Sequence, residues 1–337
     1  MVLEMLLVYS LLCLIISFLS TYLVTQKYIK YAKEHGILTH DAHKPGKPLV
    51  ANRGGLSFLV LPPIIITTSL ILDYVANLRL LKDAIALSIS FLIIAFVGYL
   101  DDTRDLGLVK VPLMLLGGLP FIILGTYVPR PIIPFIGAAR LTIVYPLGIL
   151  LTYLVIPNAF NMIDVQNGVM CSAAISVLTA LVFWSLILSR PEAILLSIIL
   201  GGIIGFFLLN MYPAKVLPGN IGSYGVGALI TGAIILSRLE YVALIALLPV
   251  ILHGFYLLRS IGGLMTKEKI SEKMGRPVYV DENGVIHPMP YSNAPFSLTR
   301  MFVVIYGPMP ESEIVKKYYS IFAFSCFLAI LTGFFML

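Results

Sequence analysis

The sequence predicts an all-α, polytopic membrane protein with about ten transmembrane helices, forming a single integral membrane domain over residues 1–337. Of these residues, 59% are apolar and 12% are charged, whereas soluble domains carry about 25% charged residues. At about 20 residues per spanning helix, this apolar content supplies about ten spans. The apolar runs are continuous, and a membrane β-barrel would instead alternate apolar and polar residues.

Ten apolar runs follow one another along the chain, each near the length that crosses a bilayer. They are Met5–Val24, Gly55–Leu72, Ala84–Leu100, Val111–Tyr127, Leu141–Ile156, Val169–Ser189, Ala193–Asn210, Gly222–Leu239, Tyr241–Leu258 and Tyr318–Leu337. The first run carries Glu4 and lacks a basic leader and a small-residue cleavage site, so we expect a retained helix rather than a signal peptide. An even number of spans places both termini on one side.

Basic residues between the runs predict the orientation. The odd-numbered loops hold 17 of the 23 Lys and Arg residues, and the even-numbered loops hold 6. Loops rich in Lys and Arg stay in the cytoplasm. We therefore expect a multi-pass protein of the cell membrane with cytoplasmic odd loops and both termini outside. The net charge of +6 reflects these loops, so nucleic acid is not an expected partner.

The three cysteines lie inside apolar runs, at Cys13, Cys171 and Cys326. Their spacing fits neither a disulfide framework nor a zinc site. We expect no disulfide.

Unusual polar residues gather on the face predicted to be cytoplasmic. Asp101 and Asp102 directly follow the third run, where an unpaired charge is costly. Carboxylates there can hold a divalent cation or accept a proton, and Lys110 can hold a phosphate. The alternative is a helix end whose acids are solvated by water among the lipid headgroups.

Three further polar segments fall on the same face, and each has a plainer alternative. The segment Asn161–Gly168 ends a run in amides and one acid, although Asn-Gly also simply forms turns. Gly219–Gly227 begins within the sequence Pro218-Gly219-Asn220, although small residues also form helix-packing stripes. His43, Lys44 and Lys47 form a basic group that anionic lipid would attract by default.

The order of these segments is more specific than any one of them. In sequence they are His43-Lys44-Pro45-Gly46-Lys47-Pro48 with Gly54-Gly55, Leu100-Asp101-Asp102, Asn158-Ala159-Phe160-Asn161, and Pro213-Ala214-Lys215 with Pro218-Gly219-Asn220-Ile221-Gly222-Ser223. This series resembles the polyprenyl-phosphate N-acetylhexosamine-1-phosphate transferases, a glycosyltransferase family 4 type of enzyme, over nearly the whole chain. The resemblance is nearest to the branch that acts on dolichyl phosphate, which includes archaeal members.

The resemblance implies a reaction. A polyprenyl or dolichyl phosphate attacks the β-phosphorus of a UDP-sugar, UMP leaves, and a lipid diphosphate sugar starts a lipid-linked glycan or a cell-wall precursor. Phosphoryl transfer depends mainly on positioning and on neutralising phosphate charge, commonly with Mg²⁺ and lysine. Mg²⁺ is therefore the expected cofactor, with Mn²⁺ as a substitute. The resemblance implies contact with membrane lipid, and a homodimer is expected only because family members form dimers.

The resemblance also implies roles for single residues. Asp101 and Asp102 match the paired aspartates that act on the lipid phosphate and its deprotonation, so they are the expected catalytic residues. Lys110 lies about one position from a family lysine that contacts phosphate. Lys44 and Lys47 belong to the first motif and are expected substrate contacts.

Further site residues follow from the third and fourth motifs. Asn161 matches an amide near the nucleotide, and Asp164 matches the bacterial branch only; both are expected to bind substrate. Asn167 and Asn220 fall where family members carry metal ligands. At position 220 the family has aspartate, so this chain loses a negative charge there, and weaker metal binding is expected. Loss of catalysis, with a binding or scaffolding role retained, is an alternative.

The last cytoplasmic loop, residues 259–317, is the longest and most polar segment, and the resemblance implies that it recognises the sugar. A small β-hairpin is predicted from Val278 to Ile286, around an Asn-Gly turn. Arg276 and His287 are expected substrate contacts; their alternative is an ordinary solvated position. Because His287 is the only histidine in this loop, the bacterial histidine cluster is absent. The loop therefore favours UDP-N-acetylglucosamine over a peptide-bearing sugar.

A secondary transporter is the competing interpretation from another functional class. It would place ionisable residues at mid-membrane in broken helices, with related halves. Here the acids lie at the ends of the runs, and His253 is the one ionisable residue well inside a run.

Overall fold

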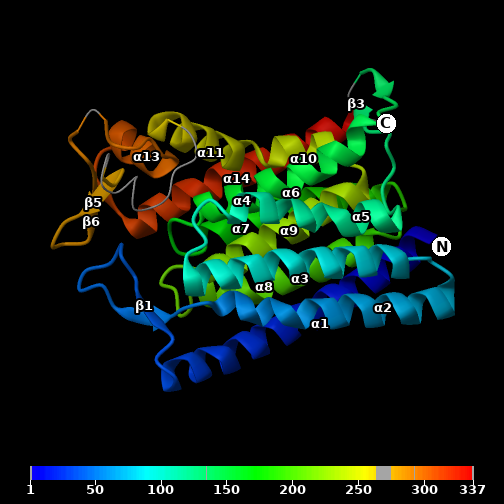
Figure 1. The fold of residues 1–337 in the computed structure, drawn as a ribbon, viewed down its shortest axis with the longest axis horizontal. Coiled ribbons are helices and arrows are strands. Elements are labelled where there is room, and N and C mark those ends of the chain that lie inside the picture. The colour runs from blue at the N-terminus through cyan, green and yellow to red at the C-terminus, as the bar shows by residue number, and fades with distance from the viewer. Residues whose placement is uncertain (1, 134, 263–274, 292, 336–337) are drawn as a thin grey trace.

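The computed structural model describes residues 2–133, 135–262, 275–291 and 293–335, which form a bundle of long helices (Figure 1). The α-helices are α1 (Val2–Glu34), α2 (Leu61–Ala76), α3 (Leu81–Arg104), α4 (Lys110–Met114), α5 (Leu119–Leu124), α6 (Val144–Ile163), α7 (Val169–Ile187), α8 (Ala193–Asn210), α9 (Gly219–Ser237), α10 (Glu240–Ala246), α11 (Leu248–Ile261), α13 (Leu298–Tyr306) and α14 (Glu311–Phe334). Two 3₁₀ helices are η1 (Gly54–Val60) and η2 (Leu115–Gly118). The predicted all-α membrane architecture is confirmed.

Eight of the described helical segments are long and apolar enough to cross a membrane. Helices α10 and α11 meet at a bend of 63° and make a ninth span if the pair is counted as one. The fourth predicted run is interrupted, because prolines and glycines divide it into α4, η2 and α5, and its apolar part, Lys110–Leu124, is shorter than a span. Ten crossings require this short segment to count, so the exact number stays a prediction.

Three small sheets lie among the loops between the helices. β1 (Leu38–His40) pairs with β2 (Leu49–Ala51), and β3 (Ile132–Ile133) pairs with β4 (Gly137–Ala138). The third sheet contains β5 (Val278–Val280), β6 (Val285–Pro288) and β7 (Met309–Pro310), all antiparallel. The predicted hairpin is therefore confirmed as β5–β6, with β7 added from the chain just before α14.

Helices α8 and α9 form the centre of the bundle, with 83% and 89% of their spans buried. Glycines allow neighbouring backbones to approach the start of α9. A Cβ placed on Gly98 of α3 would lie 2.6 Å from the Asn220 carbonyl oxygen, and one placed on Gly55 of η1 would meet the backbone of Gly222. The glycine-rich segment is thus a packing surface, and this packing brings the start of α9 against the end of α3.

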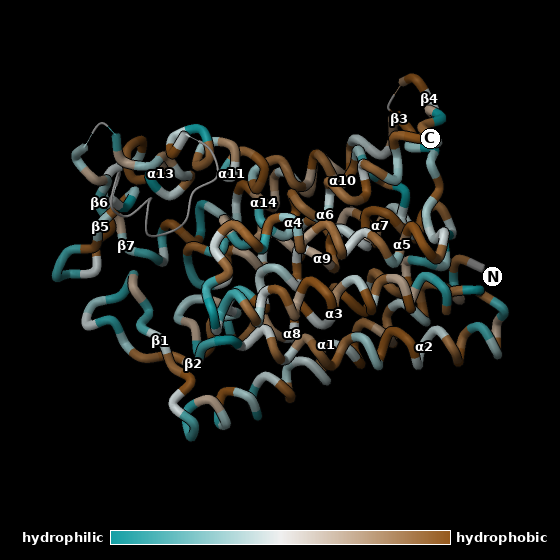
Figure 2. The backbone as a smooth tube through the Cα atoms, in the orientation of Figure 1, coloured by the Kyte–Doolittle hydropathy of each residue, from teal (hydrophilic) through white to brown (hydrophobic). Residues whose placement is uncertain are grey.

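The two ends of the bundle differ. The described chain begins and ends at one end, while β1, β5 and β6 lie at the other (Figure 1). Apolar residues line the lengths of the helices, and hydrophilic residues gather at the ends, extensively beside β1 and β5 (Figure 2). The two ends of the described chain therefore lie at the same end of the bundle, in agreement with the predicted even number of spans. That this end faces the outside remains a prediction from the basic residues.

The described cysteines carry no disulfide, as expected. Cys13 and Cys171 are buried free thiols, and Cys326 is a half-buried one.

Candidate active site

The paired aspartates stand in the last turn of α3, opposite the first turn of α9. Asp102 accepts a hydrogen bond from the Asn220 N–H at 2.9 Å and another from the Ile221 N–H at 3.0 Å. These N–H groups have no partner within their own helix, and the helix dipole favours a negative charge beside them. Gly219 leads into this turn with φ +67°, and a Cβ there would lie 2.8 Å from Asp102 Oδ2.

Asp101 points into the protein, where its side chain is 2% exposed. Its Oδ2 accepts from Lys110 Nζ at 2.8 Å, from Asn220 Nδ2 at 2.8 Å and from the Tyr224 hydroxyl at 3.3 Å. Its Oδ1 accepts from the Leu106 N–H at 3.1 Å. The expected contact between Lys110 and a phosphate is therefore, in this structure, an ion pair with Asp101.

Asn161 joins the same group from α6. Its Nδ2 donates to Asn220 Oδ1 at 2.8 Å and to Ser223 Oγ at 2.9 Å. The sequence suggested a loop here, but α6 continues to Ile163, so Asn161 lies in the last helical turn. The structure thus brings together five predicted site residues from four elements: Asp101, Asp102, Lys110, Asn161 and Asn220. We call this group the aspartate cluster.

A second polar group surrounds Lys44. The ammonium of Lys44 contacts Asp41, Asn167 Oδ1 and, at 3.3 Å, Glu311 Oε2. The side chains of Asp41 and Glu311 are 4% and 1% exposed, and buried charges of this kind persist when they are paired. Asn167 is fixed further, because its Oδ1 accepts from the Ala214 N–H at 3.0 Å and its N–H donates to Glu311 at 3.1 Å. Lys44 therefore ties its own loop to two distant segments.

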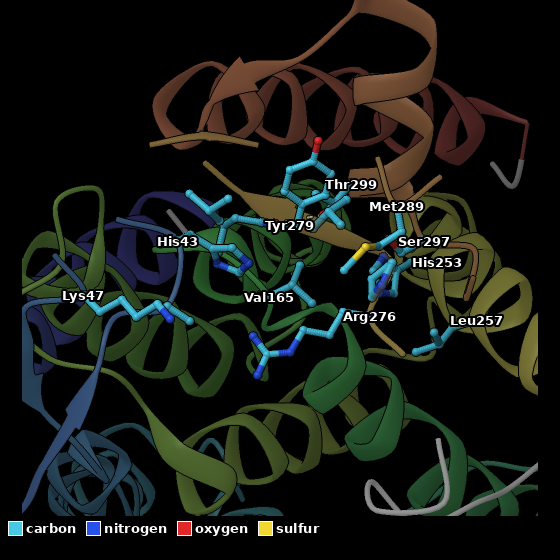
Figure 3. A pocket seen from close by; sticks show the side chains of 15 residues that line it. His43, Lys47, Val165, His253, Leu257, Arg276, Tyr279, Met289, Ser297 and Thr299 are labelled. Atoms are coloured by element: carbon cyan, nitrogen blue, oxygen red, sulfur yellow. Dashed lines mark hydrogen bonds between the residues drawn. The ribbon is translucent and has the colours of Figure 1, made fainter. Parts of the chain in front are cut away.

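A cavity of about 590 Å³ lies beside the Lys44 group (Figure 3). It is lined by the cationic side chains of Lys47 and Arg276 and by His43, and the guanidinium of Arg276 points toward the side where the other two lie. Neutral polar and apolar side chains complete the wall: Val165, Gln166, His253, Leu257, Tyr279, Met289, Ser297 and Thr299. We call this space the basic cavity. Its charge suits an anionic group, and its remaining wall suits a neutral one.

The cationic character of the basic cavity depends on pH through His43. Burial lowers the pKa of His43 below its ordinary value; the Asp41 carboxylate opposes this shift, and Lys44 and Arg276 reinforce it. His43 is therefore neutral near pH 7 when no anion is present.

Two predicted contacts are not part of the lining of the basic cavity. His287 is on β6, where its Nε2 is 3.0 Å from Asp281 Oδ2 and its ring stacks on Tyr279 with centroids 5.1 Å apart. The side chain is outside the lining of the basic cavity, so it supports Tyr279 rather than facing a ligand. Hydrogen bonds from the Val285 N–H and then from His287 lower the pKa of Asp281. Asp164 directly follows α6 and is not among the residues that line the basic cavity.

Several residues that contact the site side chains were not predicted from the sequence. Arg53, with φ +56°, donates from Nη2 to the Asp102 carbonyl oxygen at 2.7 Å. Asp41 and Glu311 hold Lys44, and Tyr224 bonds Asp101. The sequence signal for Asp41 was its position three residues before Lys44. Glu311 lies 267 positions from Lys44, and no sequence pattern linked them.

The two residues predicted as metal ligands lie in different groups, and their amide oxygens already accept hydrogen bonds. Asn220 Oδ1 accepts from Asn161, and Asn167 Oδ1 accepts from Lys44 and Ala214. Among the described residues, no group of three or more His, Cys, Asp or Glu side chains could hold a metal ion. Mg²⁺ binds in octahedral geometry to carboxylates, waters and substrate phosphates. The side chains of the protein alone do not fit a resident Mg²⁺.

Taken together, the fold and site define a multi-pass membrane protein with a carboxylate pair, a lysine and a cationic cavity at one end of its bundle. Comparison with known proteins agrees. The model of glycosyl transferase family 4 matches residues 84–238, which include the whole aspartate cluster but not Lys44, Lys47, Arg276 or His287.

Full-length relatives extend the match. One is a protein of Saccharolobus solfataricus with the provisional name UDP-N-acetylglucosamine–dolichyl-phosphate N-acetylglucosaminephosphotransferase, 33% identical over 90% of this chain and 91% of its own. A protein of Sulfolobus acidocaldarius with the same provisional name is 30% identical over 90% of both chains. The phospho-N-acetylmuramoyl-pentapeptide-transferase of Streptococcus uberis is 29% identical over 68% of this chain and 74% of its own. The chain belongs to glycosyl transferase family 4, as its motif order indicated.

Proposed function

We propose that this protein transfers N-acetylglucosamine-1-phosphate from UDP-N-acetylglucosamine to a polyprenyl or dolichyl phosphate. The observation that carries the proposal is the aspartate cluster, in which Asp101, Asp102 and Lys110 are fixed where two membrane helices end. The relatives named as acting on UDP-N-acetylglucosamine and dolichyl phosphate align over nine tenths of the chain. A lipid phosphate and a soluble nucleotide sugar can meet only at such a membrane edge.

In the proposed reaction, an oxygen of the lipid phosphate bonds to the β-phosphorus of the donor, and the bond from that phosphorus to the bridging oxygen breaks. UMP leaves with the bonding electrons. A phosphate monoester has a second pKa near 6, so at neutral pH most of the acceptor is already deprotonated. Asp101 and Asp102 therefore need only take up a residual proton and orient the attacking oxygen, while Lys110 neutralises developing phosphate charge.

The basic cavity is the proposed site of the nucleotide sugar. Lys47 and Arg276 supply positive charge for the diphosphate, and His43 adds to it when the bound anion favours its protonated form. Ser297, Thr299 and Gln166 offer neutral hydrogen-bonding groups. The proposal that residues 259–317 recognise the sugar is supported by Arg276, Tyr279, Ser297 and Thr299, although residues 263–274 lie outside the described part of the chain. The predicted contacts at Asp164 and His287 are not part of this proposed site.

The proposed location is the cytoplasmic face of the cell membrane. The proposal is supported by the loops rich in Lys and Arg, which lie at the same end of the bundle as the aspartate cluster, because loops of this kind usually stay in the cytoplasm. Contact with membrane lipid is supported by large apolar side chains exposed along the helices, such as Leu11, Leu19 and Phe96. A homodimer remains an expectation from the family.

The direct test is transfer of label. Purified protein is incubated with radiolabelled UDP-N-acetylglucosamine, a polyprenyl phosphate and Mg²⁺, and the label is then extracted into butanol. Label in the lipid phase, together with released UMP, is the expected result. Omission of the polyprenyl phosphate is the control, and it should leave all of the label in water.

One observation favours a second function. Asn220 is neutral and occupied by hydrogen bonds, which suits a chain that binds substrates without transferring phosphate. Such a protein would bind the nucleotide sugar and produce no butanol-soluble label at any concentration of metal. Binding measured in the same samples separates the two functions.

A further inference from the structure

The aspartate cluster and the Lys44 group share one feature: a protein cation or an amide N–H stands where a metal ion would otherwise bind. In the aspartate cluster, Lys110 and the Asn220 amide both donate to Asp101 Oδ2 at 2.8 Å. In the Lys44 group, one ammonium contacts oxygens of Asp41, Asn167 and Glu311. Oxygen ligands of this kind are those that Mg²⁺ and Mn²⁺ require.

The orientation of the Asn220 amide follows from its neighbours. An ionised carboxylate only accepts hydrogen bonds, so the atom of Asn220 that faces Asp101 must be the NH₂ group. The amide oxygen then faces Asn161, which supplies an NH₂ group at 2.8 Å. Asn220 therefore presents a donor, not a ligand, toward the carboxylate pair.

The charges around the carboxylate pair also disfavour a bound metal ion. Lys110 neutralises Asp101, and its side chain is 17% exposed, so the pair is largely removed from solvent. Asp102 is held by two N–H groups of α9, and Arg53 adds a positive charge at its carbonyl oxygen. Together with Arg53, the cluster has two cationic side chains, Lys110 and Arg53, against two carboxylates, so it offers little attraction to a dication.

We infer that the protein alone binds no divalent metal in the aspartate cluster, that the metal enters only as a complex with the diphosphate of the donor, and that Asn220 sets this order. The identity of the donor rests on the proposed function; the statement about the protein alone does not. Mg²⁺ is commonly held by one or two carboxylates together with substrate phosphates and water. The diphosphate supplies the negative charge that this cluster lacks.

The substitution Asn220→Asp should allow the metal to bind before the nucleotide. It replaces an amide donor 2.8 Å from Asp101 with a second carboxylate, and two adjacent carboxylates require a cation or a proton between them. The variant should therefore bind metal without nucleotide. Lys110→Met should act in the same direction, because it removes the cation that competes for Asp101.

Equilibrium dialysis of radioactive Mn²⁺ against the full-length protein in detergent measures this directly. Wild type alone should retain no Mn²⁺ above the detergent blank, and addition of UDP-N-acetylglucosamine without acceptor should produce about one retained ion per chain. Asn220→Asp should bind Mn²⁺ at least tenfold more tightly than wild type without nucleotide. Asn77→Asp is the matched control, because it adds the same charge at an exposed position after α2 and should change nothing.

Two results would overturn the inference. One is stoichiometric binding of Mn²⁺ by wild type alone with the affinity seen in the presence of nucleotide, a result that needs no variant to fold. The other is identical Mn²⁺ binding by Asn220→Asp, Lys110→Met and Asn77→Asp, each confirmed as folded by its melting transition. Binding of the nucleotide sugar is followed in parallel: its absence in every sample would refute the proposed function and leave the measurement on the protein alone valid.

Discussion

Gly219 is the position at which a single methyl group should disrupt the aspartate cluster most selectively. Its φ of +67° costs a residue with a Cβ about 1–2 kcal/mol. The Cβ of Gly219→Ala would also lie 2.8 Å from Asp102 Oδ2 and 3.0 Å from Arg53 Cα, so the carboxylate must move. Each charge-assisted hydrogen bond that Asp102 then loses to α9 is worth about 1.5–3 kcal/mol.

The expected consequence is a loss of activity larger than the loss of stability. A displacement of about 1 Å at a reacting group costs roughly 10²-fold in rate. We expect Gly219→Ala to transfer label into butanol about 100-fold more slowly than wild type while remaining folded in detergent. Initial rates at saturating donor and a thermal melt of the same sample measure both effects.

Gly125→Ala provides the matched control. Gly125 ends α5 with φ +61°, and a Cβ there meets nothing within 4 Å. This variant carries the same backbone strain without the contact with Asp102, so its rate should stay close to that of wild type. If Gly219→Ala kept the rate of Gly125→Ala, Asp102 would not depend on this geometry and the reasoning would be refuted.

Three other predictions concern charge. Lys110→Met leaves Asp101 buried without its cation and should lower stability by about 3 kcal/mol, measured as a lower melting temperature in detergent; recovery should follow when Asp101→Asn is added, and no recovery would contradict the pairing. Because a bound diphosphate favours protonated His43, donor affinity should rise as pH falls from 7.5 toward 6, and His43→Gln should flatten this profile. Arg276→Ala should raise the donor KM with little change in kcat, whereas Lys316→Ala, at an exposed position, should alter neither. If both variants changed the donor KM equally, Arg276 would not contact the donor.

The helices were predictable because continuous apolar runs report directly on burial in lipid or protein. Ala193–Asn210 matches α8 at both ends, and Val169–Ser189 differs from α7 only at its end. Polar residues obscured other ends: α3 continues through Asp101 and Asp102 to Arg104, and α6 includes Asn161. Their side chains bond within the protein, so these polar residues do not end the helix.

The site was predictable only where motifs lie close in sequence or match a family. The meeting of α3, α6 and α9 at Asp101, Asn161 and Asn220 followed from their shared membrane face and from the resemblance. The ion pair of Lys44 with Glu311 did not, because tertiary packing alone joins residues so far apart. For the same reason the sequence assigned Lys44 to substrate, while the structure shows its ammonium surrounded by protein oxygens.

The most direct test of the central claim is the transfer rate of Asp101→Asn and Asp102→Asn, measured beside the binding of UDP-N-acetylglucosamine. Each substitution keeps the shape of the side chain and removes its charge at the junction of α3 and α9. We expect both variants to stay folded, to bind the nucleotide sugar in the basic cavity and to produce no butanol-soluble label. Near-normal transfer by both variants would show that the aspartate cluster is not the active site.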